Sequence, residues 1–376
     1  MKIKKRVILS GGGTGGHIYP AVAVAEALKE RYGADGVEIL FIGAEGRMEM
    51  DKIPALGYKI IGLPIAGLQR RFTLLNLLLP FKIVGSLFKA MRIIREFKAD
   101  VVVGFGGYAS APVLWAASRC NIPTIIQEQN SYAGLTNKII GRSAETICVA
   151  YDGMDEFFEG RNIVKTGNPL RGKFAPSGDS TLRSEALKYF ELDDVRPVVL
   201  VVGGSLGTRT LNNMMCRWVE KLEGAKPEVQ VIWQTGKYYE AEMRSFIEAQ
   251  PIDGVWQGAF LERMDLAYEA ADLVISRSGA CTVSELCLMA KATIFVPSPN
   301  VAEDHQTKNA LALVDRDAAF MVADCDAVEQ GMARAVELLR DDKVIEMLRR
   351  NIASLASPDA AQLVVDEIDK VLRKNV

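Results

Sequence analysis

The stretch RVILSGGGTGGHIYPAV, Arg6 to Val22, joins a short apolar run to a helical pattern through a turn that holds five glycines. Arg6–Ser10 predicts a strand, and the apolar spacing from Pro20 onward predicts a helix with Pro20 near its first turn. Glycine turns of this kind can bind phosphates, because backbone N–H groups approach an anion closely at a helix N-terminus. The turn also matches G-x-G-x-x-G, the pattern of nicotinamide and flavin enzymes. The turn therefore predicts a binding site for a diphosphate, which could belong to NAD, a UDP-sugar or a lipid pyrophosphate. The alternative is a tight turn that binds no ligand.

The same organisation continues along the first half of the chain. Short apolar runs at Glu38–Ile42, Asp100–Val103 and 124–126 each lead into a loop, and the second of these loops begins GFGGY. Short β-branched strands that alternate with helices predict a parallel sheet covered on both faces.

Strand, glycine turn and helix then recur about half a chain later. Pro197–Val202 enters GGSLGTRTLN, Gly203–Asn212, and further strand-like runs follow at 231–236, 273–286 and 293–299. The predicted fold class is therefore α/β, with two tandem Rossmann-like, doubly wound domains. Their glycine loops should lie at the carboxyl ends of the strands, where such sheets bind ligands.

The domain boundary is predicted near KTGNPLRGKF, Lys165–Phe174, because glycines and a proline interrupt the pattern there. We expect a first domain over 1–167 and a second over 172–352. A last helix within 357–376 carries apolar residues on one face. Since no strand follows it, we expect it to pack on the first domain.

Composition limits the function classes. The chain has 376 residues, 49% of them hydrophobic and 24% charged, with a formal net charge of -2. These values are those of an ordinary globular protein, and they give no charge excess that would favour nucleic acid. The six cysteines form no C-x-x-C and no zinc spacing, which favours a reduced, cytoplasmic compartment. The apolar run after the first lysines is too short for an export signal, so none is expected.

Seven motifs occur in order along nearly the whole chain: GGTGGH, GFGGY, EQN followed by AGLTNK, GNPLR, GGSLG, SRSGA followed by TVSE, and DHQTKNA. Together they resemble the MurG family of bacterial glycosyltransferases. The resemblance implies a GT-B fold with a cleft between the two domains. It also implies an inverting hexosyltransferase that moves N-acetylglucosamine (GlcNAc) from UDP-GlcNAc to the C4 hydroxyl of lipid I, the undecaprenyl-pyrophosphoryl-MurNAc-pentapeptide. The product would be lipid II, for peptidoglycan synthesis.

The resemblance further implies where the partners bind. Lipid I would bind the first domain and UDP-GlcNAc mainly the second, on the cytoplasmic face of the cell membrane, where cell-wall synthesis proteins are further expected partners. No cofactor is implied.

His17 is the candidate general base. It follows the glycines at a helix start, where the macrodipole disfavours the imidazolium form, so a neutral ring that accepts a proton from the acceptor hydroxyl is expected. The alternative is a histidine that only caps the helix or packs. Thr14, Gly15 and Gly16 are the residues of this turn expected to bind substrate.

Arg171, in GNPLR, is predicted to stabilise the charge that develops on departing UDP, because its planar guanidinium suits a diphosphate. The alternative is a surface salt bridge. The resemblance implies the other contacts: Ser205 with the donor diphosphate, the Leu261 backbone with uracil, Asn130 and Gln306 with the sugar, and the segment Ala280, Cys281, Thr282, Val283 and Ser284 with the nucleotide. His305 departs from members that carry adjacent glutamines there, so its role stays open.

Glu285 has two interpretations. By spacing, Thr282-Val-Ser-Glu285 is a capping box and needs no ligand. The match to SGA and TVSE favours a carboxylate that accepts hydrogen bonds from the ribose hydroxyls and belongs to the catalytic set.

The segment 68–98 combines leucines and phenylalanines with basic residues, and its apolar core is too short and broken to span a membrane. It predicts contact with the anionic surface of the cytoplasmic membrane. An ordinary buried helix with a basic edge is the alternative.

Two other function classes stay open at this point. Glu45, just after the second predicted strand, is a possible ribose ligand of an NAD(P)-dependent oxidoreductase, although a second glycine loop argues against a single dinucleotide. A non-catalytic UDP-sugar-binding module is the other alternative. No Asp-x-Asp pair is expected to hold the diphosphate through a metal, and no metal site is predicted.

Overall fold

The computed structural model describes residues 4–65, 79–172 and 180–374, and the chain divides into two compact units. Unit 1 comprises Met1–Gly172 and Asp359–Val376, and unit 2 comprises Lys173–Pro358. The predicted cleft between the two units stays a prediction.

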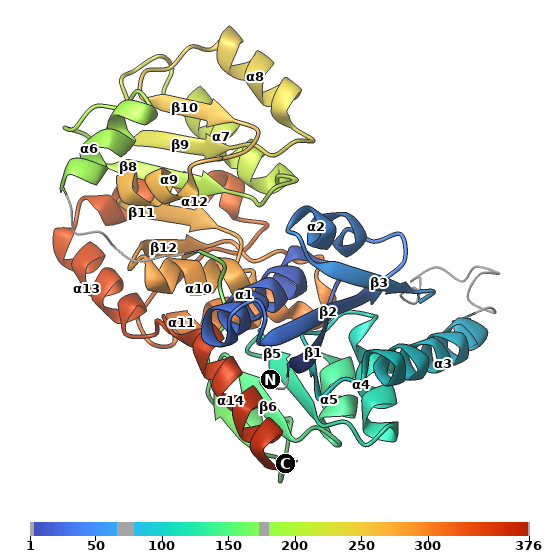
Figure 1. Ribbon diagram of the computed structural model, residues 1–376. Helices are drawn as coiled ribbons and strands as arrows, with labels where there is room; N and C mark the ends of the chain where they lie inside the picture. Colours follow the sequence, from blue (N-terminus) through green and yellow to red (C-terminus); the bar gives the residue numbers. More distant parts are fainter. Residues whose placement is uncertain (1–3, 66–78, 173–179, 375–376) are drawn as a thin grey trace. The chain divides into compact units, whose positions relative to one another are not determined.

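Unit 1 is built around a seven-stranded parallel sheet in the order β3-β2-β1-β4-β5-β6-β7, as far as the described residues go (Figure 1). Its strands are β1 (Lys5–Ser10), β2 (Val37–Ala44), β3 (Lys59–Leu63), β4 (Val101–Gly104), β5 (Thr124–Glu128), β6 (Thr146–Val149) and β7 (Ile163–Lys165). Its helices are α1 (Gly15–Tyr32), α2 (Glu49–Ala55), α3 (Leu79–Phe97), α4 (Ser110–Arg119), α5 (Leu135–Gly141), the 3₁₀ helix η2 (Met154–Glu156) and α14 (Ala360–Lys374).

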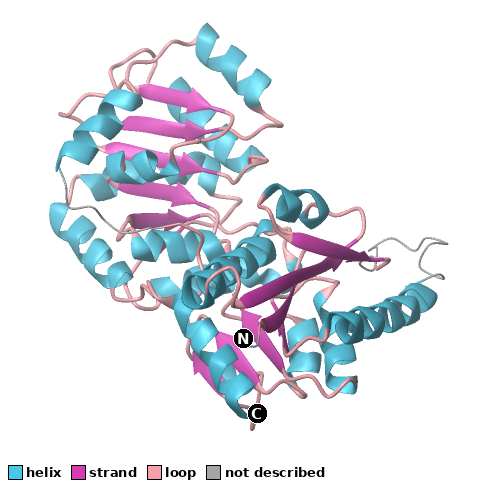
Figure 2. Ribbon diagram, in the orientation of Figure 1, coloured by secondary structure: helices cyan, strands magenta, loops and turns pink. Residues whose placement is uncertain are grey.

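Both faces of this sheet are buried, which explains why its strands are apolar throughout. Successive residues of a strand point to opposite faces. In β1, Val7 and Leu9 therefore pack in the core beneath α1 and α14, while Ile8 packs in the core beneath α3 and α4. Figure 2 shows the helices on either side of the sheet.

Helix α14 belongs to unit 1 although unit 2 separates it from the rest of that unit in the sequence. It lies beside α1 and buries Val364, Val365, Ile368 and Val371 in the core shared with β1. Arg31 of α1 pairs with two of its aspartates. The apolar face of the terminal helix therefore finds its partner in the first sheet.

Unit 2 repeats the architecture with a second parallel sheet, in the order β10-β9-β8-β11-β12-β13 among the described residues (Figure 2). Its strands are β8 (Val198–Val202), β9 (Gln230–Gln234), β10 (Val255–Gly258), β11 (Leu273–Ser276), β12 (Ala292–Phe295) and β13 (Phe320–Met321). Its helices are α6 (Ser180–Tyr189), α7 (Arg209–Lys221), α8 (Glu240–Ala249), α9 (Met264–Ala270), α10 (Ala280–Leu288), the 3₁₀ helix η3 (Ala302–Asp304), α11 (His305–Val314), α12 (Ala327–Leu339) and α13 (Asp342–Ala353). The prediction of two tandem doubly wound domains is confirmed.

The first helix begins earlier than its sequence predicts. Helix α1 starts at Gly15, with Thr14 at the N-cap position, so Pro20 lies inside the helix instead of near its first turn. Glycines are poor helix formers, and their spacing hides this start. Because of the earlier start, His17 lies within the first turn of α1.

The segment predicted to contact a membrane is described only in part. Residues 68–78 lie outside the described residues, and the remainder forms α3. Throughout the described parts of the chain, no helix combines the length and the apolar character needed to cross a membrane.

Candidate active site

In unit 1 the glycine loops lie where the strand order reverses. Strands β1 and β4 are neighbours in the sheet but not in the sequence, and each ends in a glycine loop. Crevices at such a switch point, outside the carboxyl ends of the strands, are where open α/β sheets bind ligands. The two loops meet there, since the Phe105 N–H donates to the Ser10 carbonyl at 2.7 Å.

His17 is held by the first loop. Its Nδ1 lies 3.0 Å from the Gly12 carbonyl oxygen and 3.3 Å from the Thr14 hydroxyl. A carbonyl oxygen can only accept, so the contact with Gly12 requires a proton on Nδ1. In this tautomer Nε2 is the nitrogen that can accept a proton, as a general base must.

The second loop packs directly against this histidine. A Cβ on Gly106 would lie 3.0 Å from the Cδ2 and Nε2 atoms of His17, and a Cβ on Gly107 would overlap the Gly12 carbonyl. Both glycines have positive φ, which other L residues rarely adopt. The GFGGY motif is therefore required by the close approach of two loops around His17.

Asn130 is positioned by a buried carboxylate. Glu128 ends β5 with 2% of its surface exposed, and its Oε1 accepts hydrogen bonds from the Asn130 backbone and side-chain nitrogens at 3.0 and 3.2 Å. Its Oε2 accepts from Asn137 and from the Gly134 backbone. The EQN and AGLTNK motifs thus form one loop around a single carboxylate.

A chain of buried amides links three of the predicted motifs in unit 1. Gln129 donates to the Phe105 carbonyl at 2.9 Å, and Asn168 donates to the Gln129 carbonyl at 3.0 Å. The loops after β4, β5 and β7 therefore meet at the same edge of the sheet as His17.

Arg171 forms a surface salt bridge, which was the alternative to its predicted contact with UDP. Its Nε donates to Glu26 of α1 at 3.1 Å, and both side chains are more than two-fifths exposed. Such a surface pair contributes little to stability, so the guanidinium can exchange its partner at small cost.

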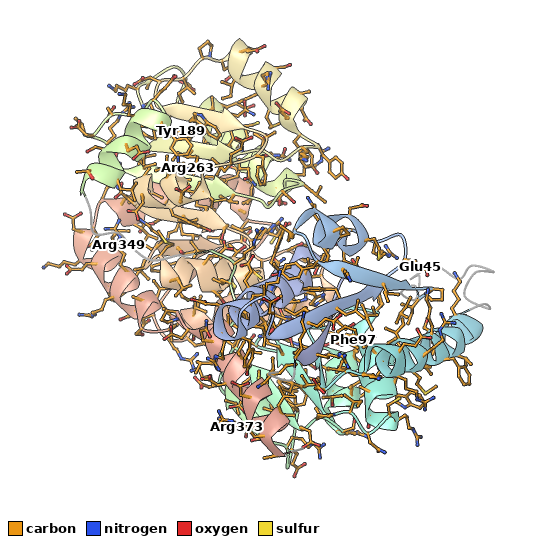
Figure 3. All side chains as sticks on the ribbon, in the orientation of Figure 1. Glu45, Phe97, Tyr189, Arg263, Arg349 and Arg373 are labelled. Atoms are coloured by element: carbon orange, nitrogen blue, oxygen red, sulfur yellow. The ribbon has the colours of Figure 1, made fainter. Side chains whose placement is uncertain are left out.

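Glu45 directly follows β2, at the start of the connection to α2 (Figure 3), and forms an ion pair with Lys89 of α3 at 2.8 Å. The carboxylate that was a possible ligand of a dinucleotide ribose therefore pairs with a lysine of α3 instead.

Unit 2 has the same kind of switch point between β8 and β11. Ser205 lies in the loop after β8 and is exposed, ahead of α7. The loop after β11 leads into α10, so the predicted diphosphate and nucleotide segments both follow strands at this reversal.

Glu285 does not cap α10. The helix begins at Ala280 with Gly279 at the N-cap and no side-chain cap hydrogen bond, so the capping-box interpretation of Thr282 and Glu285 is wrong. The spacing matches, but both residues lie inside the helix. Instead the Glu285 carboxylate accepts a hydrogen bond from the Tyr268 hydroxyl at 3.0 Å.

The environment of Glu285 changes its acidity. Burial raises the pKa of Glu285 to about 7, because the ionised form loses hydration, while the hydrogen bond from Tyr268 opposes this rise. The same burial raises the pKa of the Tyr268 hydroxyl well above its usual value. An acid with such a pKa inside a ligand-binding edge is a candidate functional group.

The remaining predicted donor residues lie in unit 2 with defined partners. The Leu261 N–H already donates to the Gln234 side chain at 3.1 Å, which leaves its carbonyl for a base. The Gln306 side chain accepts from the Ser298 N–H at 2.9 Å, and Ser284 donates to the Ala280 carbonyl. His305 contacts its own turn, with Nδ1 2.8 Å from the Ala302 carbonyl oxygen.

Two Asp-x-Asp spacings occur in the chain, Asp315-Arg316-Asp317 and Asp324-Cys325-Asp326. The expectation that no such pair holds the diphosphate through a metal stays a prediction. Asp324 forms an ion pair with Arg277 at 2.6 Å and accepts from Thr210, while Asp326 precedes α12 as its N-cap residue. The described residues contain no cluster of three or more His, Cys, Asp or Glu that could hold a metal.

Comparison with known proteins extends over both units. The glycosyltransferase family 28 N-terminal domain matches residues 7–149, and the corresponding C-terminal domain matches residues 198–364. The chain belongs to glycosyltransferase family 28. Membership in this family confirms a glycosyltransferase and sets aside the NAD(P)-dependent oxidoreductase.

Two relatives of about the same length as this chain carry the same name. A transferase of Parabacteroides distasonis is 50% identical over 371 residues, covering 99% of both chains, and one of Porphyromonas gingivalis is 51% identical, covering 98% of this chain and 96% of that protein. Both are called UDP-N-acetylglucosamine–N-acetylmuramyl-(pentapeptide) pyrophosphoryl-undecaprenol N-acetylglucosamine transferase. The crystal structure of Acinetobacter baumannii MurG matches with a TM-score of 0.77 and 30% identity, covering 97% of this chain and 99% of that one. The MurG resemblance and the GT-B fold class are confirmed.

The sequence motifs miss three residues that hydrogen-bond to the predicted binding residues. Glu49, Tyr268 and Gln234 make hydrogen bonds to the first glycine loop, to Glu285 and to Leu261. Each is remote in sequence from its partner. Other polar residues accompany each of them in α2, α9 and β9, so polarity alone does not single them out in the sequence.

Proposed function

We propose that this chain transfers GlcNAc from UDP-GlcNAc to the C4 hydroxyl of lipid I and so produces lipid II. The near-complete coverage of transferases that carry this name supports the proposal. The observation that carries it is the 3.0 Å contact between His17 Nδ1 and the Gly12 carbonyl oxygen, from which we infer that Nε2 is the proton acceptor beside a loop suited to an anion.

The two units have separate roles in this proposal. Unit 1 binds lipid I, with the pyrophosphate at the N–H groups of Thr14, Gly15 and Gly16. The Gly13 N–H already donates to Glu49, so the anion is limited to the part of the loop that begins α1. Unit 2 binds UDP-GlcNAc, with Ser205 at the diphosphate, Ala280–Ser284 around the nucleotide and Glu285 at the ribose.

The reaction is a direct displacement. The C4 hydroxyl oxygen of lipid I attacks the anomeric carbon of GlcNAc, its proton passes to His17 Nε2, and the bond from the anomeric carbon to the UDP oxygen breaks. UDP leaves from the opposite face, so the α-linked donor gives a β-1,4 link. Arg171 leaves Glu26 and pairs with the negative charge that develops on UDP. Asn130 and Gln306 orient the sugar.

Peripheral binding to the cytoplasmic membrane surface completes the proposal, since the acceptor is carried by a lipid. Helix α3 presents apolar side chains to solvent, with Phe88 65% and Val84 51% exposed. Lys82, Arg92 and Arg95 are exposed on the same helix. Apolar groups flanked by cations favour an anionic lipid surface over water.

Analysis of the lipid product tests the proposed reaction. Purified protein incubated with lipid I and UDP-GlcNAc should yield a lipid whose mass increases by one N-acetylhexosamine and whose new bond a β-specific hexosaminidase removes. UDP-glucose and NAD serve as controls. A protein that binds UDP-GlcNAc but leaves lipid I unchanged would be a binding module and would contradict the proposal.

A further inference from the structure

Glu49, the first residue of α2, is an ionisable side chain in a buried place. Only 1% of its surface is exposed. Its Oε2 accepts a hydrogen bond from the Gly13 N–H at 2.9 Å, and its Oε1 accepts one from the Ala44 N–H at 3.0 Å. Burying a carboxylate is costly unless its oxygens are hydrogen-bonded, and here each oxygen has a backbone donor. The carboxylate thus joins the end of β2 to the first glycine loop.

The surrounding backbone leaves room for this carboxylate and little else. A Cβ on Gly12 would overlap the carboxylate itself, and a Cβ on Gly43 would lie 2.6 Å from Glu49 Cγ. Two glycines, one in the loop and one in β2, are therefore needed for Glu49 to reach the Gly13 N–H. Helix α2 follows the end of β2 (Figure 1). Because Glu49 is the first residue of α2, the short connection 45–48 is enough for its side chain to reach the Gly13 N–H.

The bond to Gly13 acts on the peptide group that also binds His17. The Gly13 N–H and the Gly12 C=O are the two ends of one planar peptide group. Glu49 accepts from its N–H, and His17 Nδ1 donates to its C=O at 3.0 Å. The carboxylate therefore fixes the orientation of this peptide plane. It also polarises the group, because hydrogen bonds in a chain strengthen one another.

We propose that Glu49 is a positioning residue that sets the tautomer and orientation of His17 through the Gly12–Gly13 peptide group. This inference rests on the proposed role of His17 as the general base. A carboxylate that holds a catalytic histidine directly, through its Nδ1–H, is a common arrangement. Here one peptide group lies between the two, so no proton needs to move to or from Glu49. Nδ1 keeps its proton while Nε2 accepts the proton of the C4 hydroxyl.

Two variants weaken the hydrogen bonds of Glu49 with the Gly13 and Ala44 N–H groups to different extents. Glu49→Ala removes both acceptors. Glu49→Gln keeps the shape and one acceptor oxygen, but its amide N–H₂ then faces a second backbone N–H, so only one of the two hydrogen bonds can survive. Asp51→Asn is the matched control, because Asp51 is an exposed acid of the same helix.

Nitrogen NMR of the histidines tests the proposal without any substrate. The chain has two histidines, so a His305→Asn variant assigns both ring spectra. In the wild type, His17 should show a protonated Nδ1 and an unprotonated Nε2 at a pH where the ring is neutral. In Glu49→Ala the Nε2–H tautomer should become populated, and in Glu49→Gln to a smaller extent. The His305 signals, which report a turn in unit 2, should not change.

Kinetics separate positioning from a general loss of structure. The kcat for transfer should fall on the order of tenfold or more in Glu49→Ala, while KM for UDP-GlcNAc stays unchanged. A loss of this order is known for residues that orient the histidine ligands of metal sites through hydrogen bonds. Asp51→Asn should match the wild type. If Glu49→Ala fails to fold, Glu49→Gln gives both measurements.

The outcomes distinguish this inference from the proposed function. A wild type that transfers no GlcNAc but shows the Nδ1–H tautomer, lost in the Glu49 variants, would refute the function and leave the positioning intact. Folded Glu49 variants with an unchanged His17 tautomer and unchanged kcat would overturn the inference, whatever the activity of the wild type.

Discussion

Two side chains of the predicted site, His17 and Glu285, have immediate surroundings that bear on their acid–base chemistry. For His17, the Gly12 carbonyl selects a tautomer, and for Glu285, burial raises the pKa of the carboxyl group. The sequence identifies both residues through the motifs around them. It does not reveal Gly12 as the carbonyl partner or Tyr268 as the donor, because those contacts depend on how separate segments meet in space.

The His17→Ala variant tests the general base. Proton transfer by a positioned side chain contributes about 10²- to 10⁴-fold, so kcat for transfer to lipid I should fall by that order. Binding of UDP-GlcNAc, measured by calorimetry, should stay within about twofold of the wild type, since the proposed donor site lies in unit 2. Unchanged turnover would remove His17 from the mechanism.

The Glu285 carboxyl group predicts a pH dependence of donor binding. In the proposed complex the ribose hydroxyls donate to the ionised carboxylate of Glu285, so donor binding should favour loss of its proton. With a pKa of about 7 in the unliganded protein, Glu285 is mostly protonated below that pH. The Kd for UDP-GlcNAc should therefore rise as pH falls below about 7, by up to about tenfold per pH unit, and level off above it.

Titration calorimetry from about pH 5.5 to about 8.5 measures this dependence, and UDP-GlcNAc is preferred to UDP because UDP itself titrates in that range. Glu285→Gln should bind more weakly than the wild type at high pH and show a flat profile. Tyr268→Phe should move the wild-type profile to higher pH, because it removes a hydrogen bond that lowers the pKa. A profile equally steep in Glu285→Gln would assign the titration to another group.

At the scale of elements, the buried parallel strands could be predicted because their apolar runs are continuous. The strands over β1, β2, β4, β5 and β8 match the predicted runs within a few residues. Strands β7 and β13 span three and two residues, which is too short for any periodicity to show. The start of α1 and the cap of α10 were not predictable, since tertiary contacts override weak local preferences there.

Helix α3 carries the predicted contact with lipid. Replacing Val84 and Phe88 together by serine removes exposed apolar surface that only a partner would cover. The wild type should sediment with vesicles that contain phosphatidylglycerol, less so at high salt, and the double variant should be retained several-fold less.

Val195→Ser is the control for α3, because Val195 is 85% exposed and lies in unit 2. It should bind vesicles like the wild type. Equal retention of all three proteins on anionic vesicles, or none with any lipid, would count against membrane contact through α3.

At the scale of the whole molecule, one chain builds two similar sheets and returns to the first through α14. The repeat of strand, glycine turn and helix makes the two sheets predictable from sequence. The packing of α14 on the first domain could be predicted only because no strand follows this helix. The residues of α1 and β1 that contact α14 could not be predicted, because no local pattern encodes a contact between residues more than 300 positions apart.

Ile368 and Leu363 test how much unit 1 depends on α14. Ile368 is fully buried and Leu363 is 40% exposed on the same helix. Ile368→Ala should lower the free energy of unfolding by about 2–5 kcal/mol, while Leu363→Ala should cost well under about 1 kcal/mol. Urea unfolding monitored by a unit 1 signal such as Trp115 fluorescence measures both. Equal small effects would mean that α14 is dispensable for unit 1.

Release of UDP from UDP-GlcNAc, measured in one preparation with and without lipid I, tests the central claim most directly. The account predicts rapid release only when lipid I is present, with one GlcNAc gained by the lipid for each UDP released. Release at the same rate without lipid I would indicate a hydrolase, and no release in either case would indicate a binding protein. Either result would contradict transfer between the two proposed sites.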